Sequence, residues 1–116
     1  MATGFFMSAT LSITIESFLD YLKFEKRYSL HTITSYKNDL EQFKSFLLSQ
    51  FEVEQIEQIS SVMIRSWLVE LMEDKRTATS IHRKLSTLRS LFKFHLKKGT
   101  IKKMPLDNIQ IGRAHV

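Results

Sequence analysis

The chain has 116 residues, an apolar fraction of 43% and a formal net charge of +5, so it allows one domain with a single modest core and excludes two. It contains no cysteine, which excludes disulfides and thiolate metal sites, and no apolar run approaches the roughly 18 residues that a membrane span needs. The charge is segregated: residues 39–74 hold two Lys/Arg and eight Asp/Glu, whereas residues 75–106 hold ten Lys/Arg and no acidic residue. This pattern favours a polyanionic partner, and a solvated basic surface explains it equally well.

The first part of the chain is predicted to form a flexible leader, residues 1–12, and two helices. Apolar residues recur at i, i+3, i+4 and i+7 from Ile15 to Leu22, which predicts a helix over about residues 13–27. Ser29 then provides an N-cap for a second helix that runs to about residue 48. The apolar stripe of this second helix consists of Ile33, Tyr36, Leu40, Phe43 and Leu47.

The second part of the chain is predicted to form two more helices. Residues 49–59 read as a connection with one short turn, and Ser60 or Ser61 caps a third helix. A fourth helix covers residues 79–97 and ends at Gly99, because glycine tolerates the left-handed conformation of a C-cap. Pro105 bars further helix at that point, and residues 105–111 form a turn or a short fifth helix. The stripes are Ile64, Trp67, Leu68, Leu71 and Met72 in the third helix and Ile81, Leu85, Leu88, Phe92 and Leu96 in the fourth.

The sequence therefore predicts an all-α, compact four-helix bundle whose core includes Trp67 and the nine phenylalanines. No strand pattern and no internal repeat is present. We also find no glycine-rich phosphate loop, no HExxH and no paired carboxylates in a credible pocket, so we predict no catalytic residue, no cofactor and no metal site. The acidic residues of 39–74 are interpreted as solvated surface.

Two helices present polar faces that lack acidic residues. Opposite the stripe of the fourth helix lie hydroxyl residues around one long cation: Thr79, Arg83, Ser86, Thr87 and Ser90, with Lys84 and Arg89 beside them. The second helix carries a weaker version with His31, Thr34, Ser35 and Asn38, and with Thr32 in its first turn. Small hydroxyls admit and bond a phosphate backbone, and arginine can reach a guanine edge with two bonds. Any single hydroxyl on such a face is more often plain solvated surface.

Three motifs resemble the N-terminal core-binding domain of tyrosine recombinases, particularly the Xer-type and Bacteroidetes integrase branch. The first consists of Tyr28, Ser29, Thr32, Tyr36, Asp39, Leu40 and Phe43. The second consists of Ser80, Ile81, Arg83, Leu85, Ser86, Leu88, Arg89, Leu91 and Phe92. The third consists of Pro105, Leu106 and Ile109, and departs from the family at Met104, where asparagine is usual.

The resemblance implies a SAM-like bundle over residues 13–111 that binds double-stranded DNA at a recombination core site. Residues 112–116 would begin a linker to a catalytic domain that holds all the cutting residues, so this chain is expected to bind DNA without cutting it. In the family the second and fourth helices enter adjacent major grooves. Carried over by motif, the DNA contacts are His31, Thr32, Thr34, Ser35, Asn38, Thr79, Ser80, Arg83, Ser86 and Thr87, with Lys75 and Arg76 as phosphate clamps and Arg89 at the flank.

The family also implies partners and a location. Full-length recombinases assemble as tetramers on DNA, whereas the isolated domain is expected to be a monomer in the bacterial cytoplasm, on the nucleoid when bound to DNA and without membrane contact. An alternative from another class is a helical protein-interaction or assembly module, without intrinsic DNA binding, whose acidic and basic ends pair with neighbours.

Overall fold

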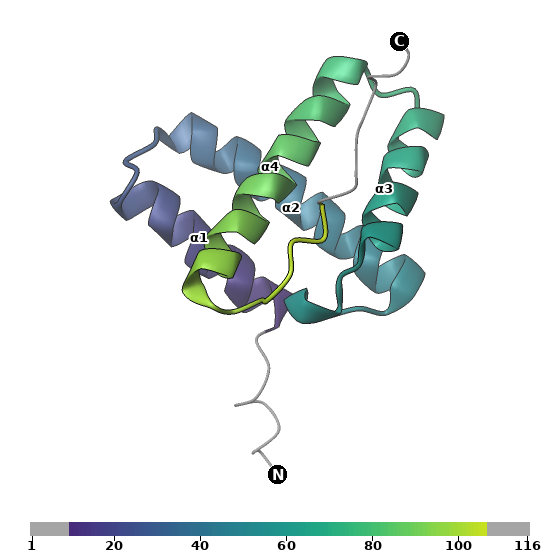
Figure 1. Ribbon diagram of the computed structural model, residues 1–116. Helices are drawn as coiled ribbons and strands as arrows, with labels where there is room; N and C mark the ends of the chain where they lie inside the picture. The colour runs from purple at the N-terminus through teal and green to yellow at the C-terminus, as the bar shows by residue number, and fades with distance from the viewer. Residues whose placement is uncertain (1–9, 107–116) are drawn as a thin grey trace.

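The computed structural model describes residues 10–106, which fold into four α-helices and one short 3₁₀ helix. The helices are α1 (Leu11–Phe24), α2 (Leu30–Phe51), α3 (Ser61–Glu73) and α4 (Ala78–Lys98), and the 3₁₀ helix η2 (Ile56–Gln58) lies between α2 and α3. Within the described range the extended backbone amounts to a single bridge between Thr10 and Gln55. The predicted all-α, four-helix architecture is confirmed (Figure 1).

A hydroxyl residue caps the N-terminus of each α-helix. The Ser29 Oγ accepts a hydrogen bond from the Thr32 N–H at 3.2 Å, and the Thr77 Oγ1 accepts one from the Ser80 N–H at 3.1 Å. Thr10 and Ser60 do the same for α1 and α3. Each cap satisfies one of the N–H groups that the first turn leaves without a partner, so each helix begins where its cap stands.

The C-terminus of α4 ends as the sequence predicts. Gly99 has φ 85°, the left-handed conformation that closes a helix, and its N–H donates to the carbonyls of His95 and Leu96. The end of α2 differs from the prediction: the helix continues to Phe51, and Glu52 supplies the left-handed cap with φ 55°. Helix α1 begins at Leu11, two residues earlier than expected, because Thr10 caps it.

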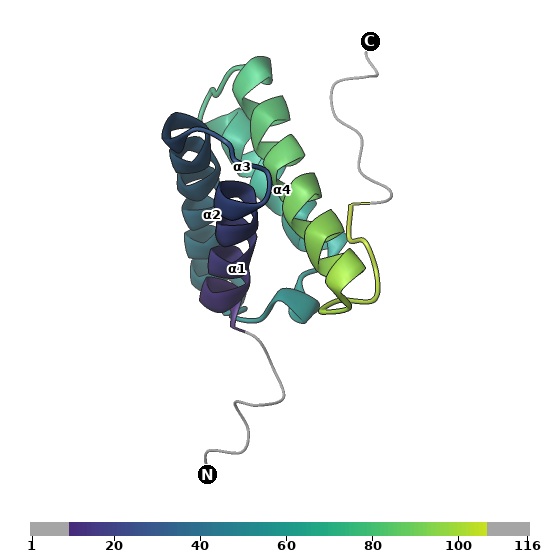
Figure 2. The same ribbon diagram turned by 90° about the vertical axis from the view of Figure 1, so that its left-hand side faces the viewer.

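The core lies where all four helices meet. Helix α1 packs between α2 and α4, and α3 closes the other side of α2 (Figure 2). Phe43 of α2 contacts Trp67 of α3 with ring centroids 4.9 Å apart, and Phe18 of α1 contacts Phe94 of α4 at 5.6 Å. The exposed fraction of Phe18, Phe43 and Trp67 is 2% or less, so these rings provide much of the apolar burial that holds the bundle together.

The core differs from the prediction at four residues. Leu96 is 38% exposed and Met72 is 56% exposed, although both complete the helical stripes, since each lies at the edge of the buried arc of its helix. Phe24 is 66% exposed at the end of α1, so not every phenylalanine belongs to the core. Leu91, which the stripe of α4 omitted, is fully buried.

No helix among residues 10–106 combines the length and the apolarity that crossing a membrane requires. The greater part of the predicted leader and of the predicted fifth helix or turn, and the whole predicted linker, fall outside the described residues. Pro105 and Leu106 are described and lie in a turn, where Leu106 is buried.

Candidate nucleic-acid interface

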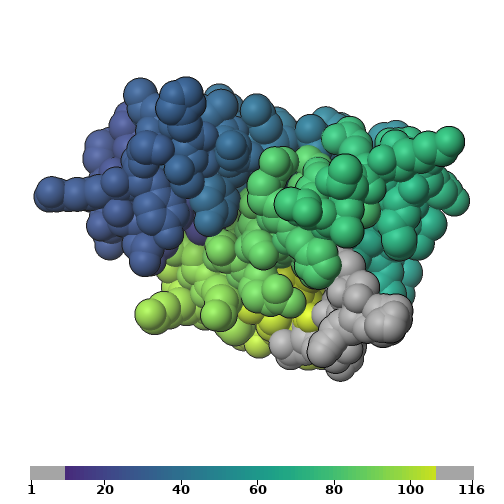
Figure 3. All heavy atoms as spheres, turned by 90° about the horizontal axis from the view of Figure 1, so that it is seen from above, coloured from purple at the N-terminus to yellow at the C-terminus, as the bar shows by residue number. Residues whose placement is uncertain are grey.

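The beginnings of α2 and α4 lie on the same face of the molecule. In Figure 1 both helices start at the upper end of the bundle, and the view from above in Figure 3 shows the first half of α2 beside the first half of α4. Neither helix has an acidic residue in its first turn. The unpaired N–H groups and the positive end of each helix dipole therefore face outward without a competing carboxylate, which favours an anion such as phosphate.

All the predicted contact residues of α2 are exposed. They are His31, Thr32, Thr34, Ser35 and Asn38. At 100° per residue, His31, Ser35 and Asn38 form one row along α2, and Asp39 and Gln42 continue this row toward α4. The Gln42 Oε1 accepts a hydrogen bond from the buried Lys84 of α4 at 2.7 Å, so the row borders α4 directly.

The predicted contact residues around α4 divide into exposed and buried side chains. Ser80 is half-buried, and the exposed ones are Lys75, Arg76, Thr79, Arg83, Ser86 and Arg89. Thr87 is a correction, because it is buried with 4% of its surface exposed and its hydroxyl bonds inside the bundle. Lys84, expected to flank the polar face, is 1% exposed. The buried arc of α4 is thus turned toward α2, which packs on the side of α4 that carries Lys84 and Thr87.

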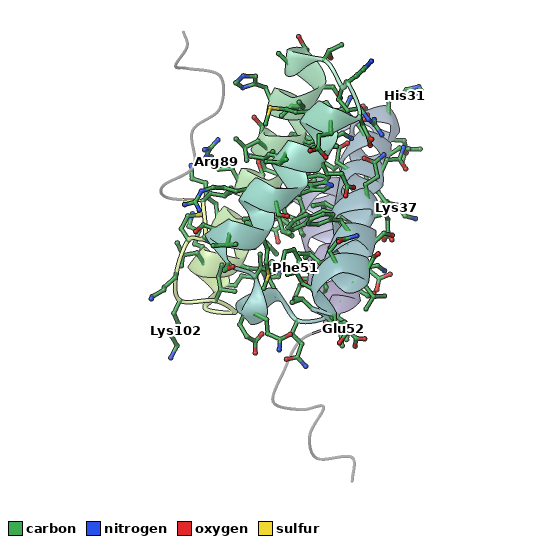
Figure 4. The ribbon with its side chains drawn as sticks, turned by 90° about the vertical axis from the view of Figure 1, so that its right-hand side faces the viewer. His31, Lys37, Phe51, Glu52, Arg89 and Lys102 are labelled. Atoms are coloured by element: carbon green, nitrogen blue, oxygen red, sulfur yellow. The ribbon has the colours of Figure 1, made fainter. Side chains whose placement is uncertain are left out.

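Arg89 does not share a face with the predicted residues of α2. In Figure 4, Arg89 lies on the opposite side of the molecule from His31 and Lys37. The helical wheel gives the reason, since Arg89 stands on the edge of α4 that lies farthest from α2, whereas Arg83 stands on the edge next to α2. The structure therefore brings the Asp39 end of the α2 row together with Arg83, and leaves Arg89 apart.

A cluster of charged and polar groups joins α2 to α4, and we call it the Asp39 cluster: Asp39, Gln42, Arg83, Lys84 and Thr87. The Asp39 Oδ1 accepts hydrogen bonds from the Arg83 Nη2 at 2.7 Å and from the Lys84 Nζ at 2.8 Å. The Asp39 Oδ2 accepts from the Arg83 Nε and from the Thr87 Oγ1, both at 3.2 Å. Among the described residues no buried side-chain nitrogen or oxygen lacks a hydrogen-bond partner, so the buried charges of this cluster are fully compensated.

The electrostatics of the Asp39 cluster favour the ionised carboxylate. Burial alone raises the pKa of Asp39, but the hydrogen bonds and positive charges of Arg83 and Lys84 outweigh burial and hold this pKa below its ordinary value of 3.8. The Asp39 carboxylate in turn raises the pKa of Arg83. Asp39 and Lys84 cancel as charges, so the cluster carries a net +1, which resides on Arg83 at the surface.

This cluster was not predicted from the sequence, because every acidic residue of 39–74 was placed on a solvated surface. Asp39 is 1% exposed, which contradicts that interpretation. One signal was available: Lys84 stands three residues after Ile81 and four before Leu88, a spacing that points its side chain inward. An inward lysine requires an inward carboxylate, and Asp39 is four residues before Phe43 on the stripe of α2.

His95 is the other buried titratable group on α4. Its Nε2 lies 2.8 Å from the Thr14 carbonyl oxygen and its Nδ1 lies 3.2 Å from the Thr100 hydroxyl. Burial lowers the pKa of His95, so the neutral ring donates to the carbonyl and accepts from the hydroxyl. His95 therefore holds α4 to α1 and to the segment after Gly99. No group of three or more His, Cys, Asp or Glu in residues 10–106 is arranged to hold a metal ion.

These features define a small helical domain whose exposed polar, non-acidic face is built from α2 and α4. Residues 15–99 match the family model described as "Phage integrase, N-terminal SAM-like domain". Similar curated proteins are tyrosine recombinases XerC: that of Anoxybacillus flavithermus is 37% identical over 95 residues, which cover 82% of this chain and 31% of that protein. The XerC of Listeria innocua is 41% identical over 92 residues, which cover 79% of this chain and 30% of that protein.

This chain belongs to the family of phage integrase N-terminal SAM-like domains. It spans about a third of the length of the curated relatives that it matches. No solved structure gives a significant match. The family expectation drawn from the three sequence motifs is thereby confirmed for residues 15–99.

Proposed function

We propose that this chain is the DNA-binding domain of a site-specific tyrosine recombinase or integrase. It grips a recombination core site by placing α2 and α4 in adjacent major grooves. The observation that carries the proposal is the outer face of these two helices, which both start at the upper end of the bundle, expose polar residues and have no acid in their first turns. The relatives named tyrosine recombinase XerC support the recombination role.

The proposed contacts are the predicted residues that the structure leaves accessible on this face. Phosphates are bound by Lys75 and Arg76 before α4 and by hydroxyls at the two helix starts, because these groups are exposed and carry hydrogen-bond donors. Base edges are read from the middle of the face. The whole proposed face consists of His31, Thr32, Thr34, Ser35, Asn38, Thr79, Ser80, Arg83 and Ser86. Arg89 is proposed as a phosphate contact at the far edge of α4.

The domain, on this proposal, spans residues 13–111 and acts together with a catalytic domain of the same protein. The chain alone binds duplex DNA weakly and does not cleave it. Within the full-length protein it works beside other protomers of a tetrameric synapse, on DNA in the bacterial cytoplasm. Each of these statements rests on the family and on the accessible face of α2 and α4.

The direct test is a fluorescence-anisotropy titration of a labelled duplex with the chain. We expect binding that weakens steeply between about 50 mM and about 200 mM salt, because each phosphate contact adds about 0.9 to the slope of log affinity against log salt. Lys75→Ala should lower the affinity equally for all sequences and reduce this slope by about 1. Arg83→Ala should weaken binding and also relax the base preference.

Arg65 provides the matched control, since it is an exposed arginine on α3, outside the proposed face. Arg65→Ala should leave the affinity and the salt slope unchanged. If Lys75→Ala and Arg83→Ala bind as tightly as the unaltered chain, the assigned face is wrong. An equal loss for all three variants would indicate that only the total charge matters.

One observation favours the alternative of a protein-interaction module. A groove of about 1220 Å³ lies between the end of α1 and the end of α4, lined in part by the aromatic rings of Tyr21, Tyr28 and Phe94, and the exposed Phe24 borders it. Exposed aromatic surface of this kind is common at protein contacts. Gel filtration at low and high salt, with and without duplex, separates the two functions. Self-association without a DNA-dependent shift supports the module and contradicts the DNA-binding proposal.

A further inference from the structure

The guanidinium of Arg83 is only partly used by its contacts inside the protein. An arginine has five N–H groups. Asp39 takes two of them, the Nε–H and one N–H of Nη2, which lie along one side of the guanidinium plane. Asp39 is its only hydrogen-bonding partner within residues 10–106, and the Arg83 side chain is 56% exposed. The outer edge, with one N–H of Nη1 and one of Nη2, thus remains free and points away from Asp39.

Asp39 is a rigid support for this arginine. Its side chain is 1% exposed, and besides Arg83 it accepts hydrogen bonds from the buried Lys84 and from Thr87. Lys84 is itself fixed by Gln42 at 2.7 Å. The carboxylate therefore cannot turn to follow the arginine, and the arginine takes its orientation from the carboxylate. Because Lys84 already neutralises Asp39, the positive charge of Arg83 stays available to an outside partner.

We propose that Asp39 is a positioning residue that aims the outer edge of Arg83 at the O6/N7 edge of a guanine in the major groove. This inference rests on the proposed DNA-binding function. Two parallel N–H groups fit two adjacent acceptors in one plane, which guanine presents in the major groove and a phosphate presents on the backbone. Arg83 is exposed in the second turn of α4, within the part of that helix proposed to enter the groove, and the experiment below distinguishes a base edge from a phosphate.

Positioning matters because a free arginine side chain loses much rotational freedom when it binds. The two bonds to Asp39 have already fixed the side chain, so less freedom is lost when Arg83 meets DNA. The expected consequence is selectivity for one base pair. A good bidentate contact discriminates against other bases by about 5-fold to about 150-fold, and this selectivity should depend on Asp39 although Asp39 itself is buried and touches no DNA.

The experiment is selection from a pool of duplexes with a randomised central segment, followed by sequencing of the bound fraction. Four proteins are compared: the unaltered chain, Arg83→Lys, Lys84→Met, and the double variant Asp39→Asn/Lys84→Met, which removes both buried charges together. Thermal unfolding shows which variants are folded, and anisotropy against salt gives the slope for each. Arg83→Lys keeps the charge but cannot span a carboxylate and a base at once.

We expect the unaltered chain to enrich a guanine at one position, and Lys84→Met to enrich the same guanine less strongly, because Asp39 keeps its bonds from Arg83 and Thr87 but loses the one from Lys84. The double variant and Arg83→Lys should lose this preference by at least about 5-fold, with the salt slope and the preferences at other positions unchanged. A structural role for Asp39 alone would instead lower affinity at all positions. If the preference survives in a folded double variant, or in Arg83→Lys where the double variant does not fold, the inference is overturned.

Two other results separate this inference from the proposed function. If the unaltered chain binds duplexes but enriches no base, or if Arg83→Lys changes nothing while Arg83→Ala only lowers the salt slope, Arg83 contacts a phosphate. The inference then fails and the proposed function stands. If the unaltered chain binds no duplex from the pool, the proposed function fails, and the inference fails with it.

Discussion

Besides packing on α1, helix α2 makes two contacts of opposite chemistry, one with α3 and one with α4. Against α3 it packs Phe43 on Trp67, with ring centroids 4.9 Å apart. Against α4 it places the Asp39 carboxylate 2.8 Å from the Lys84 ammonium, with both side chains 1% exposed. An aromatic contact gains free energy from area and tolerates small rotations, whereas a buried ion pair gains little net free energy and requires defined geometry. The comparison indicates that the α2–α3 contact provides stability and the α2–α4 contact sets orientation.

The largest effect is expected from Trp67→Ala, which removes the aromatic contact. The ring is 2% exposed, and its loss should lower the free energy of unfolding by about 3 to 5 kcal/mol, through lost burial and the cavity left behind. Urea unfolding followed by circular dichroism measures this change. Val69→Ala, at an exposed position on α3, is the control and should change the free energy of unfolding by less than about 0.5 kcal/mol.

The next effect is expected from Asp39→Ala, which leaves Lys84 buried without its carboxylate. The expected loss is about 3 kcal/mol, at the lower end for a broken buried pair, because Lys84 keeps its bond to Gln42 and Arg83 can turn to solvent. This loss comes from a buried charge without its partner, whereas the loss in Trp67→Ala comes from missing apolar burial. The double variant Asp39→Leu/Lys84→Met should recover most of the stability, since two well-packed apolar side chains can replace a buried pair at little cost.

A double variant as unstable as Asp39→Ala would show that the ion pair itself stabilises the fold. That result would contradict the division of roles between the two contacts of α2. The same urea titration measures it, and an unchanged circular dichroism spectrum at low denaturant would show that the helices are retained in both variants.

Much of the fold was predictable because it depends on local signals. The cap at Ser29 and the left-handed Gly99 follow from neighbouring residues alone and are confirmed, and of the two predicted candidates Ser60 and Ser61 it is Ser60 that caps α3. The errors at Leu96 and Phe24 have a different origin. A helical stripe shows which face is apolar, but it does not show how wide an arc the neighbouring helices cover, so Leu96 at the edge of that arc was assigned to the core. Phe24 lies opposite the stripe of α1 and was assigned to the core with the other phenylalanines.

The candidate site was less predictable, for a physical reason. Asp39 and Lys84 are 45 residues apart in sequence, and only the packing of α2 on α4 shows that each compensates the other. From the charge pattern along the sequence, both residues were predicted to lie at the surface. Thr87 was misplaced in the same way, because the wheel of α4 was centred on Ile81 and the contact with α2 turns the buried arc toward Lys84. The exposed residues of the α2 row depend on α2 alone, and their exposure was predicted correctly.

Low pH should weaken the α2–α4 contact of the unaltered chain and leave its aromatic α2–α3 contact unchanged. The pKa of Asp39 in the fold lies below its ordinary value of 3.8, so its contribution to stability is complete above about pH 3.8 and is lost as the pH falls through the folded pKa. Thermal unfolding between about pH 5 and about pH 2 should show this loss. The loss should be smaller than for Asp39→Ala, because a protonated carboxyl still accepts hydrogen bonds. Asp39→Leu/Lys84→Met should show a shallower decline, and an identical decline would contradict the assignment to Asp39.

The smallest effect is expected from Thr87→Val, which tests how far the geometry of the α2–α4 contact depends on each donor. Valine has nearly the shape of threonine, so the change removes the hydroxyl that lies 3.2 Å from the Asp39 Oδ2 and leaves the packing in place. Asp39 keeps its bonds from Arg83 and Lys84, and the free energy of unfolding should fall by only about 1 kcal/mol. Thr79→Val, at an exposed position of α4, should change it by less than about 0.5 kcal/mol. A loss for Thr87→Val as large as that for Asp39→Ala would show that the hydroxyl, rather than the two cations, holds the carboxylate in place, and Arg83 would then be aimed by Thr87 through Asp39.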